Sequence, residues 1–289
     1  HPLLRIPQLA IHLDRDVNGG GLKLNPQQHL TPVWGLGSTE RGAFVGHLAE
    51  ELGTSPDDVV SWDVMVHDLT PAALVGRHQD FVSSARLDNL LSCWAATEAL
   101  ATSTQTPAPA DDAPVAVVSL FDHEEVGSTS ATGADGASLA HVLERIVIAR
   151  GGSRDDYLRS LAGSVCISAD GAHATHPNYP DRHDPDHPVV VDGGPVIKVN
   201  ANQRYATEAS TAAVVIDACE RAGVAHQRFV GRNDQPCGST IGPATAAQLG
   251  VATVDVGVAQ LAMHSARELC GATDPVRLAA MLGEFLRSP

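Results

Sequence analysis

The sequence predicts an α/β fold in which helices cover both faces of a sheet. From residue 115 onward, short and almost wholly apolar segments alternate with segments whose apolar residues recur at helical spacing. Strands that are apolar along their whole length are typical of sheets buried on both faces. The chain has 289 residues and is 43% hydrophobic, which is enough for a sizeable core.

Residues 1–78 differ from the rest of the chain, because they are rich in Pro, Gly and short alternating segments. The segments 3–13 and 59–69 are expected as strands, since apolar and polar residues alternate in them. Between these segments, residues 38–53 are expected as a helix that ends at Gly53. We therefore expect a small β-rich domain over residues 1–78.

A second domain is expected over residues 79–289, beginning with a helix near Arg86 and a loop at 103–114. The remaining elements follow from apolar runs and helical spacing. They are strands at 115–121, 163–170, 195–200 and 251–257, and helices at 138–151, 207–223 and 244–250, with a helix start at 264–271.

The composition limits the partners and the compartment. A formal net charge of −15 argues against nucleic acid or an anionic membrane surface as a partner. The apolar runs are too short for a membrane span, and the first residues do not resemble a signal peptide. The five cysteines are scattered singly without a CxxC pair, which indicates reduced thiols and a cytoplasmic location.

Carboxylates and imidazoles follow several of the expected strands, where α/β sheets collect their ligands. They are Asp122, His123, Glu124 and Glu125 after 115–121, Asp170, His173 and His176 after 163–170, and His264 after 251–257, with Asp88 near the start of the first helix of the second domain. Oxygen and nitrogen ligands without a thiolate cluster suit Zn, Mn or Co. The sequence therefore predicts a metal site at this edge of the sheet.

The number of these residues is about what two metal ions sharing a carboxylate would need. Such ions would polarise a carbonyl group and activate a water molecule for hydrolysis. The adjacent Glu124 and Glu125 are expected to point apart at the end of a strand. One of them can then bind metal while the other accepts the proton of the water.

Each of these residues also has a simpler explanation. The pair Glu124 and Glu125 fits a solvated turn, His264 a structural histidine, and Asp88 a helix cap. The segment 181–188 has a metal-like composition, but its prolines favour an exposed loop. Convergence of several strand ends favours the metal site. Two other classes of enzyme fit the sequence less well. A zinc deaminase would need a Cys-rich ligand set, and a phosphatase would need a cationic cradle for phosphate, and the sequence shows neither.

Seven stretches of the sequence resemble the M18 family of metalloaminopeptidases, the aspartyl aminopeptidases. They are PLLRIPQLAIHLDRD (2–16), SARLDNLLSC (84–93), FDHEEVGSTSATGA (121–134), ISADGAHATHPNYPDRHDPDHP (167–188), GPVIKVNANQRYA (194–206), RNDQPCGSTIGP (232–243) and QLAMHSARE (260–268). The resemblance implies a zinc-peptidase-like mixed sheet flanked by helices, with a dimerisation-type domain at 1–78. It also implies an exopeptidase that removes N-terminal Asp or Glu from peptides.

The resemblance further implies a role for each of eight residues. They are the metal ligands Asp88 (bridging two ions), Glu125, Asp170 and His264, the general base Glu124, the substrate-pocket residues His173 and Lys198, and His12, which extends toward the site of a neighbouring subunit. Lys198 is one of only two lysines, and in so acidic a protein it is a candidate for holding a substrate carboxylate. The implied cofactors are two divalent ions, Zn with Mn or Co as alternatives. The implied partners are acidic peptides and further copies of the chain, in a homo-oligomer built from dimers.

Members of the M18 family extend further at the N-terminus than this sequence. The extension holds the start of their catalytic domain and a His-x-Asp motif, whose histidine is the terminal ligand of one metal ion. We therefore expect this chain to supply one ion's ligands completely and the other's incompletely, and to be weakly active or inactive unless another polypeptide completes the site. Two alternatives are a neutral aminopeptidase of the same fold and a non-catalytic oligomerising fragment.

Overall fold

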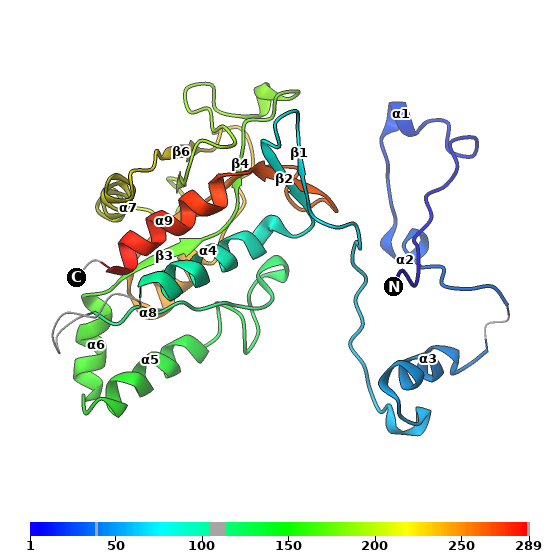
Figure 1. The fold of residues 1–289 in the computed structure, drawn as a ribbon, viewed down its shortest axis with the longest axis horizontal. Helices are drawn as coiled ribbons and strands as arrows, with labels where there is room; N and C mark the ends of the chain where they lie inside the picture. Colours follow the sequence, from blue (N-terminus) through cyan, green and yellow to red (C-terminus); the bar gives the residue numbers. More distant parts are fainter. Residues whose placement is uncertain (38–39, 104–113, 288–289) are drawn as a thin grey trace. The chain divides into compact units, whose positions relative to one another are not determined.

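The computed structural model describes residues 1–37, 40–103 and 114–287. The chain divides into two compact units, His1–Leu69 and Thr70–Pro289, whose helices and strands are labelled in Figure 1. Within the described ranges, no helix is both long enough and apolar enough to cross a membrane.

In its described residues, the first unit contains four short helical segments. They are α1 (Val17–Gly20), α2 (Pro26–His29), α3 (Ala43–Leu52) and the 3-10 helix η1 (Pro56–Asp58). Helix α3 confirms the predicted helix, and it ends at Gly53, whose φ of 65° lies in the left-handed region that glycine adopts without strain. The ring of Phe44 on α3 packs against Trp34 and Trp62 at centroid distances of 6.0 Å.

The two strands expected in the first unit, at 3–13 and 59–69, are not formed, and that prediction was wrong. Residues 59–69 contain no regular element, and 3–13 contain a turn and a single bridge from Arg5 to Val33. Alternation of apolar and polar residues gives a strand only where a second backbone completes its hydrogen bonds. The described part of this unit offers no such backbone beyond that bridge.

The second unit is built around a four-stranded mixed sheet. Its strands, in spatial order, are β3 (Val165–Ala169), β7 (Ala252–Gly257), β5 (Val196–Val199) and β6 (Gln227–Val230). Strand β7 runs parallel to β3 and antiparallel to β5, and β5 runs parallel to β6. The structure confirms three strands predicted from apolar runs (β3, β5 and β7). It adds β6, whose sequence QRFV carries no such run.

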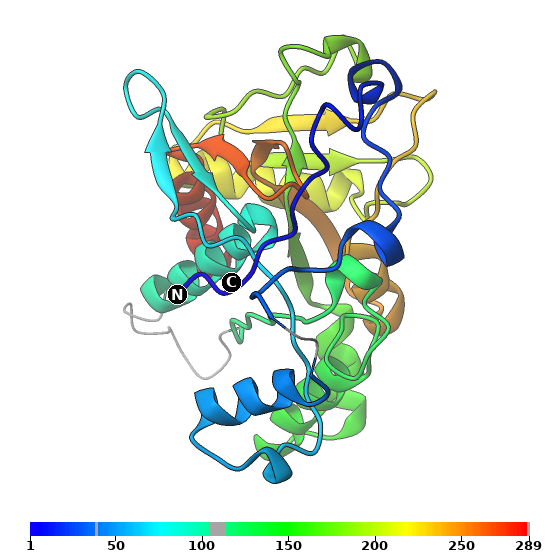
Figure 2. The ribbon, with the colours of Figure 1, turned by 90° about the vertical axis from the view of Figure 1, so that its right-hand side faces the viewer.

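Helices cover both faces of this sheet, as the sequence predicted. One face carries α4 (Leu87–Ser103), α7 (Ala209–Ala222) and α9 (Asp274–Arg287), and the other carries α5 (Ser138–Ala149), α6 (Arg154–Ala162) and α8 (Gly242–Leu249). Successive residues of β3 separate the two faces, because Ile167 packs with α4, α7 and α9 whereas Cys166 packs with α5 and α6. Helices α5 and α6 contact each other, as Figures 1 and 2 show in green.

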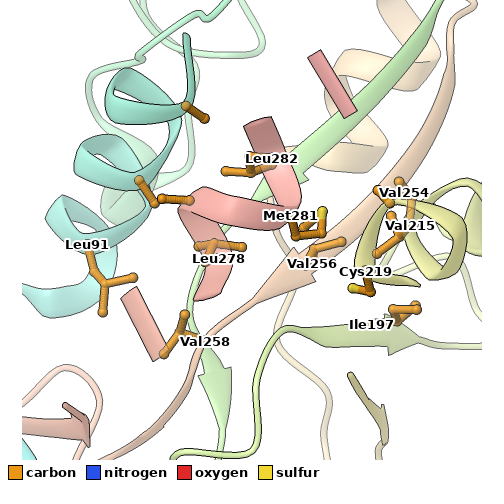
Figure 3. Packing of buried hydrophobic residues seen from close by; sticks show 14 of the residues in the cluster. Leu91, Ile197, Val215, Cys219, Val254, Val256, Val258, Leu278, Met281 and Leu282 are labelled. Atoms are coloured by element: carbon orange, nitrogen blue, oxygen red, sulfur yellow. The ribbon is translucent and has the colours of Figure 1, made fainter. Parts of the chain in front are cut away.

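The main hydrophobic core lies between the sheet and the helices α4, α7 and α9. Figure 3 shows Leu278 and Met281 of α9 lying between Leu91 of α4 and the residues Val215 and Cys219 of α7. Helix α9 thus contacts both of its neighbours and the sheet. The sequence analysis did not predict this helix, although it fills the centre of the core.

Shortening a side chain of α9 is expected to destabilise the second unit. Met281 is fully buried, so Met281→Ala should lower the free energy of unfolding by about 2–5 kcal/mol through the cavity it leaves. Val276 lies on the same helix and is 61% exposed, so Val276→Ala should change it by less than about 0.5 kcal/mol. Urea denaturation measures both, and equal effects would contradict this view of the core.

A second, five-stranded sheet contains the segment that was expected to start a helix at 264–271. Its strands, in spatial order, are β1 (Ala73–Val75), β2 (Phe81–Ser84), β9 (Glu268–Gly271), β8 (Ala259–Leu261) and β4 (Ala172–His173). The helix prediction was wrong, because β9 pairs antiparallel with both β2 and β8. Pairing on two sides overrides the helical preference of a short segment, and it leaves His264 in the loop between β8 and β9.

The segment 115–121 was predicted as a strand, and this too was wrong. Its residues contain neither strand nor helix, and no described strand pairs with them. The 3-10 helix η2 (Glu124–Val126) follows directly. The loop expected at 103–114 lies almost wholly outside the described residues.

Candidate metal centre

Three of the predicted metal ligands come together from distant parts of the chain. Asp88 from α4, Glu125 from η2 and His264 from the β8–β9 loop offer ligand atoms that all lie within 4.8 Å of one another. His264 Nε2 lies 3.0 Å from Asp88 Oδ2 and 3.3 Å from Glu125 Oε2. Across residues 1–37, 40–103 and 114–287, no other group of three or more His, Cys, Asp or Glu side chains meets this criterion.

Asp88 is the buried member of this cluster, with a side chain only 5% exposed. Its Oδ1 is buried without a hydrogen-bond partner. Burial, followed by the nearby carboxylates of Asp170, Glu125 and Glu268, raises the pKa of Asp88 to about 8. A buried oxygen without a donor, among several negative charges, is the environment that a bound cation would stabilise. The residues therefore fit a metal ion.

Glu124 and Glu125 differ in their surroundings, as expected for neighbours with separate roles. Helix η2 is bounded by His123 and Gly127, both with positive φ, at 63° and 102°. This tight turn directs Glu125, which is 54% exposed, to His264. Burial, and then nearby carboxylates, raise the pKa of Glu124 above its ordinary value. A carboxylate with a raised pKa is suited to accept a proton near neutral pH.

Asp170 follows the end of β3 and lies beside Asp88. Its Oδ1 accepts a hydrogen bond from the Gly171 amide at 2.7 Å, and its Oδ2 lies 3.3 Å from Lys198 Nζ. Burial opposes ionisation, but the Lys198 ammonium and these hydrogen bonds outweigh it, so that the pKa of Asp170 is lowered. Gly171 lets Gln260 approach closely, because a Cβ here would displace Gln260 Nε2 and lie 3.2 Å from Asp88 Oδ1.

Lys198 is not an open cation, although the sequence suggested it for binding a substrate carboxylate. Its side chain is 2% exposed, and Nζ donates to the Gly171 carbonyl at 2.9 Å as well as to Asp170. The ammonium also lies 5.1 Å from the centre of the Tyr205 ring. The structure thus gives Lys198 a contact with a candidate ligand, and its role toward substrate stays a prediction.

The remaining two predicted residues lie outside the three-residue cluster. His173 lines a cavity of about 100 Å³, together with Arg182, Tyr205, Phe229, Arg232 and Cys237 among others. Burial, followed by the charge of Lys198, lowers the pKa of His173, which keeps its imidazole neutral at pH 7. His12 is an exposed residue of the first unit, and its role toward a neighbouring subunit stays a prediction.

Sequence analysis missed Glu268, which is 98% buried beneath the cluster. Its two carboxylate oxygens accept hydrogen bonds from the backbone amides of Asp88 and His264, at 2.9 and 2.7 Å. The segment around it was expected as a helix, and a glutamate at a helix start is usually solvated. The only available signal was its place just before the apolar residues of β9.

Comparison with known proteins assigns the family. Residues 1–286 match the family described as aminopeptidase I zinc metalloprotease (M18). The chain belongs to the M18 family. It is 54% identical over 288 residues to the probable M18 family aminopeptidase 2 of Streptomyces coelicolor, and 53% identical over 289 residues to that of Mycobacterium tuberculosis H37Rv. In both cases 99% of this M18 chain is covered, and it spans 66% of the relative's length.

Solved structures of M18 proteins have the same fold. A chain in the structure of the Ape4 and Nbr1 complex has a TM-score of 0.92 at 38% identity, with 99% of this M18 chain and 58% of that chain covered. The structure described as prApe1 has a TM-score of 0.89 at 28% identity, with coverage of 98% and 63%. The S. cerevisiae mApe1 dodecamer has a TM-score of 0.79 at 25% identity, with coverage of 98% and 62%.

Proposed function

We propose that this M18 chain acts as a metal-dependent aminopeptidase that releases N-terminal Asp or Glu from peptides. The observation that carries the proposal is the meeting of Asp88, Glu125 and His264 within 4.8 Å of one another, beside a buried Asp88 oxygen that lacks a donor. Membership of a family described as zinc metalloproteases supports the choice of chemistry.

Asp88, Glu125 and His264 would hold one divalent ion, with Zn as the first candidate and Mn or Co as alternatives. A second ion, which the resemblance implies, would take Asp88 and Asp170 as its ligands from this chain. When bound, such ions supply a Lewis acid that polarises the scissile carbonyl and eases deprotonation of water.

The side chains around the cluster divide the remaining work. Glu124 accepts the proton of the attacking water and returns it to the leaving amine, for which its raised pKa is suited. Lys198 holds Asp170 ionised and fixed in place. The cavity beside His173 receives the first side chain of the peptide. Its wall carries Arg182 and Arg232, which favour an acidic side chain and outnumber the one carboxylate of the wall, Asp184.

Two observations favour a neutral aminopeptidase as the second candidate. Lys198 was the expected partner of an acidic substrate side chain, but it is buried and paired with Asp170. Arg232 is likewise paired, because its guanidinium binds both oxygens of Asp234 at 2.8 and 2.6 Å. An apolar first residue would then fit the same cavity without requiring a free cation.

A peptide panel separates these functions. With Zn, Mn or Co present, we expect the chain to release Asp and Glu from tripeptides about tenfold or more faster than Leu, because one charge-assisted hydrogen bond contributes about 1.5–3 kcal/mol. Released amino acids are measured by chromatography over long incubations, since turnover is expected to be weak. Nα-acetylated peptides are the control and should not react.

Each outcome of the panel has a distinct meaning. Equal release of Leu would replace acidic preference with the neutral aminopeptidase. Absence of release from every peptide and with every metal would leave the non-catalytic oligomerising fragment as the better account.

We also propose a homo-oligomer built from dimers and a reducing compartment such as the cytoplasm. The first proposal is supported by a structural relative described as a dodecamer. The second is supported by Cys93, Cys166, Cys219, Cys237 and Cys270, which are all free.

A further inference from the structure

Glu268 joins two of the candidate ligands through their backbones. Its Oε2 accepts from the amide of Asp88 at 2.9 Å, and its Oε1 accepts from the amide of His264 at 2.7 Å. The two amides lie 176 residues apart in the sequence, and each belongs to a residue whose side chain enters the cluster. One carboxylate, 2% exposed, therefore ties α4 to the β8–β9 loop at the three-residue cluster.

Neither tied residue has a right-handed helical backbone, and the conformation of His264 needs support. His264 has a φ of 63°, in the left-handed region that costs a non-glycine residue of order 1 kcal/mol or more. Asp88 has φ −82° and ψ 108° inside α4, which lies outside the helical range. Hydrogen bonds from amides to an ionised carboxylate are short and strong, so Glu268 can hold both conformations.

We call the carboxylate of Glu268 the clamp, because it holds the amides of both Asp88 and His264. The clamp is held in place by its own strand and by the residue before it. Glu268 is the first residue of β9 and pairs with Ser84 of β2. The adjacent Arg267 donates to the carbonyls of Thr70, Pro71 and Ser83 at 2.8–3.0 Å. The carboxylate of Glu268 thus projects from a fixed strand, and its position defines where the two amides lie.

We propose that Glu268 is a positioning residue that holds Asp88 and His264 at metal-binding distance without contacting the ion. This inference rests on the proposed metal centre. It assigns the geometry of the site to a group that binds neither metal nor substrate. Groups that orient metal ligands without binding the metal change metal affinity by about 10–100-fold when they are replaced.

The test compares Zn²⁺ binding by the wild-type chain and by Glu268→Gln, using competition with a chromophoric chelator. Gln has one acceptor oxygen and one NH₂ group, so it can accept from only one of the two amides. Affinity for Zn²⁺ should fall about 10–100-fold. The absorption spectrum of bound Co²⁺ should also change, because the ligand geometry relaxes.

Asp274 provides a matched control. It is fully buried and accepts from two backbone amides, those of Asp192 and Gly194, at 2.6 and 2.9 Å. Asp274→Asn therefore removes an equivalent bond from the fold but does not alter the cluster. It should destabilise the chain to a similar extent and leave Zn²⁺ affinity and the Co²⁺ spectrum unchanged.

Glu268→Asp distinguishes loss of the clamp from loss of the negative charge. It also provides a test of the proposal if the Glu268→Gln variant does not fold. Asp keeps the negative charge, but it is one methylene too short to reach both amides, so its affinity should also fall. Wild-type affinity in Glu268→Asp, or equal losses in Glu268→Gln and Asp274→Asn, would overturn the clamp alone. Absence of Zn²⁺ binding by the wild-type chain would overturn the proposed metal centre and the clamp with it.

Discussion

Replacing Glu124 with Gln is expected to reduce peptide hydrolysis by about 100-fold or more, the usual contribution of a general base. Gln keeps the size of the side chain but cannot accept the proton of the attacking water. Glu124 lies on η2 next to Glu125, yet it is not part of the three-residue cluster. Zn²⁺ affinity should therefore change by less than about tenfold, the smallest loss usual for a group that orients a ligand, since the described residues show no hydrogen bond from the Glu124 side chain to a proposed ligand.

The matched control is Glu98→Gln, which changes an exposed glutamate on α4. Hydrolysis of an Asp tripeptide should be unchanged in this variant. Hydrolysis at the wild-type rate by Glu124→Gln would show that another group accepts the proton. Parallel loss of Zn²⁺ affinity would instead place Glu124 among the ligands.

The sequence predicted those elements whose stability is local or whose burial is complete. Helices α5 and α7 have apolar stripes at helical spacing, and α7 ends at Gly223, a left-handed cap. Strand β7 is buried at all but its first residue, and its apolar residues indicate this environment, although Thr253 and Asp255 are buried with it through their hydrogen bonds. In these cases the pattern and the tertiary structure agree.

The failures have a common physical cause, which is that strand pairing is not local. The alternating segments 3–13 and 59–69 have no described backbone partner beyond one bridge. Residues 115–121 are apolar but unpaired. Conversely, 264–271 resembles a helix start, but pairing with β2 and β8 makes its second half a strand. A pattern of side chains does not reveal which backbones meet.

The candidate site likewise has a part that the sequence predicts and a part that it does not. The meeting of Asp88, Glu125 and His264 could be anticipated from residue types that suit a metal and from their positions near the ends of expected elements. The contacts that shape the cluster could not be anticipated. The Lys198–Asp170 pair and the Glu268 clamp join groups far apart in the sequence, and the clamp bonds to amides that carry no residue-specific signal.

Replacing Asp88 with Asn is expected to have opposite effects on metal binding and on stability. Zn²⁺ affinity should fall about 100-fold or more, because losing a ligand costs at least as much as losing a partner behind it. The metal-free variant should nevertheless melt at a higher temperature than the metal-free wild type. Burial, and then the carboxylates of Asp170, Glu125 and Glu268, raise the pKa of Asp88 to about 8. At pH 7 the metal-free wild type must therefore protonate Asp88 on folding, which costs stability, whereas Asn is neutral in both the folded and the unfolded state.

Calorimetry with and without Zn²⁺ measures both effects, with Asp217→Asn as the control on an exposed carboxylate of α7. Because the backbone amide of residue 88 is unchanged, its hydrogen bond to Glu268 remains, so the variant tests the Asp88 side chain separately from the clamp.

The wild-type chain should bind one Zn²⁺ ion tightly, since Asp170 already has Lys198 as its cation. Two tight ions per chain would show that a second complete ligand set exists. An Asp88→Asn variant that melts lower and still binds Zn²⁺ would make Asp88 a structural residue, because a buried carboxylate that serves as a metal ligand should be needed for Zn²⁺ binding and should destabilise the metal-free fold.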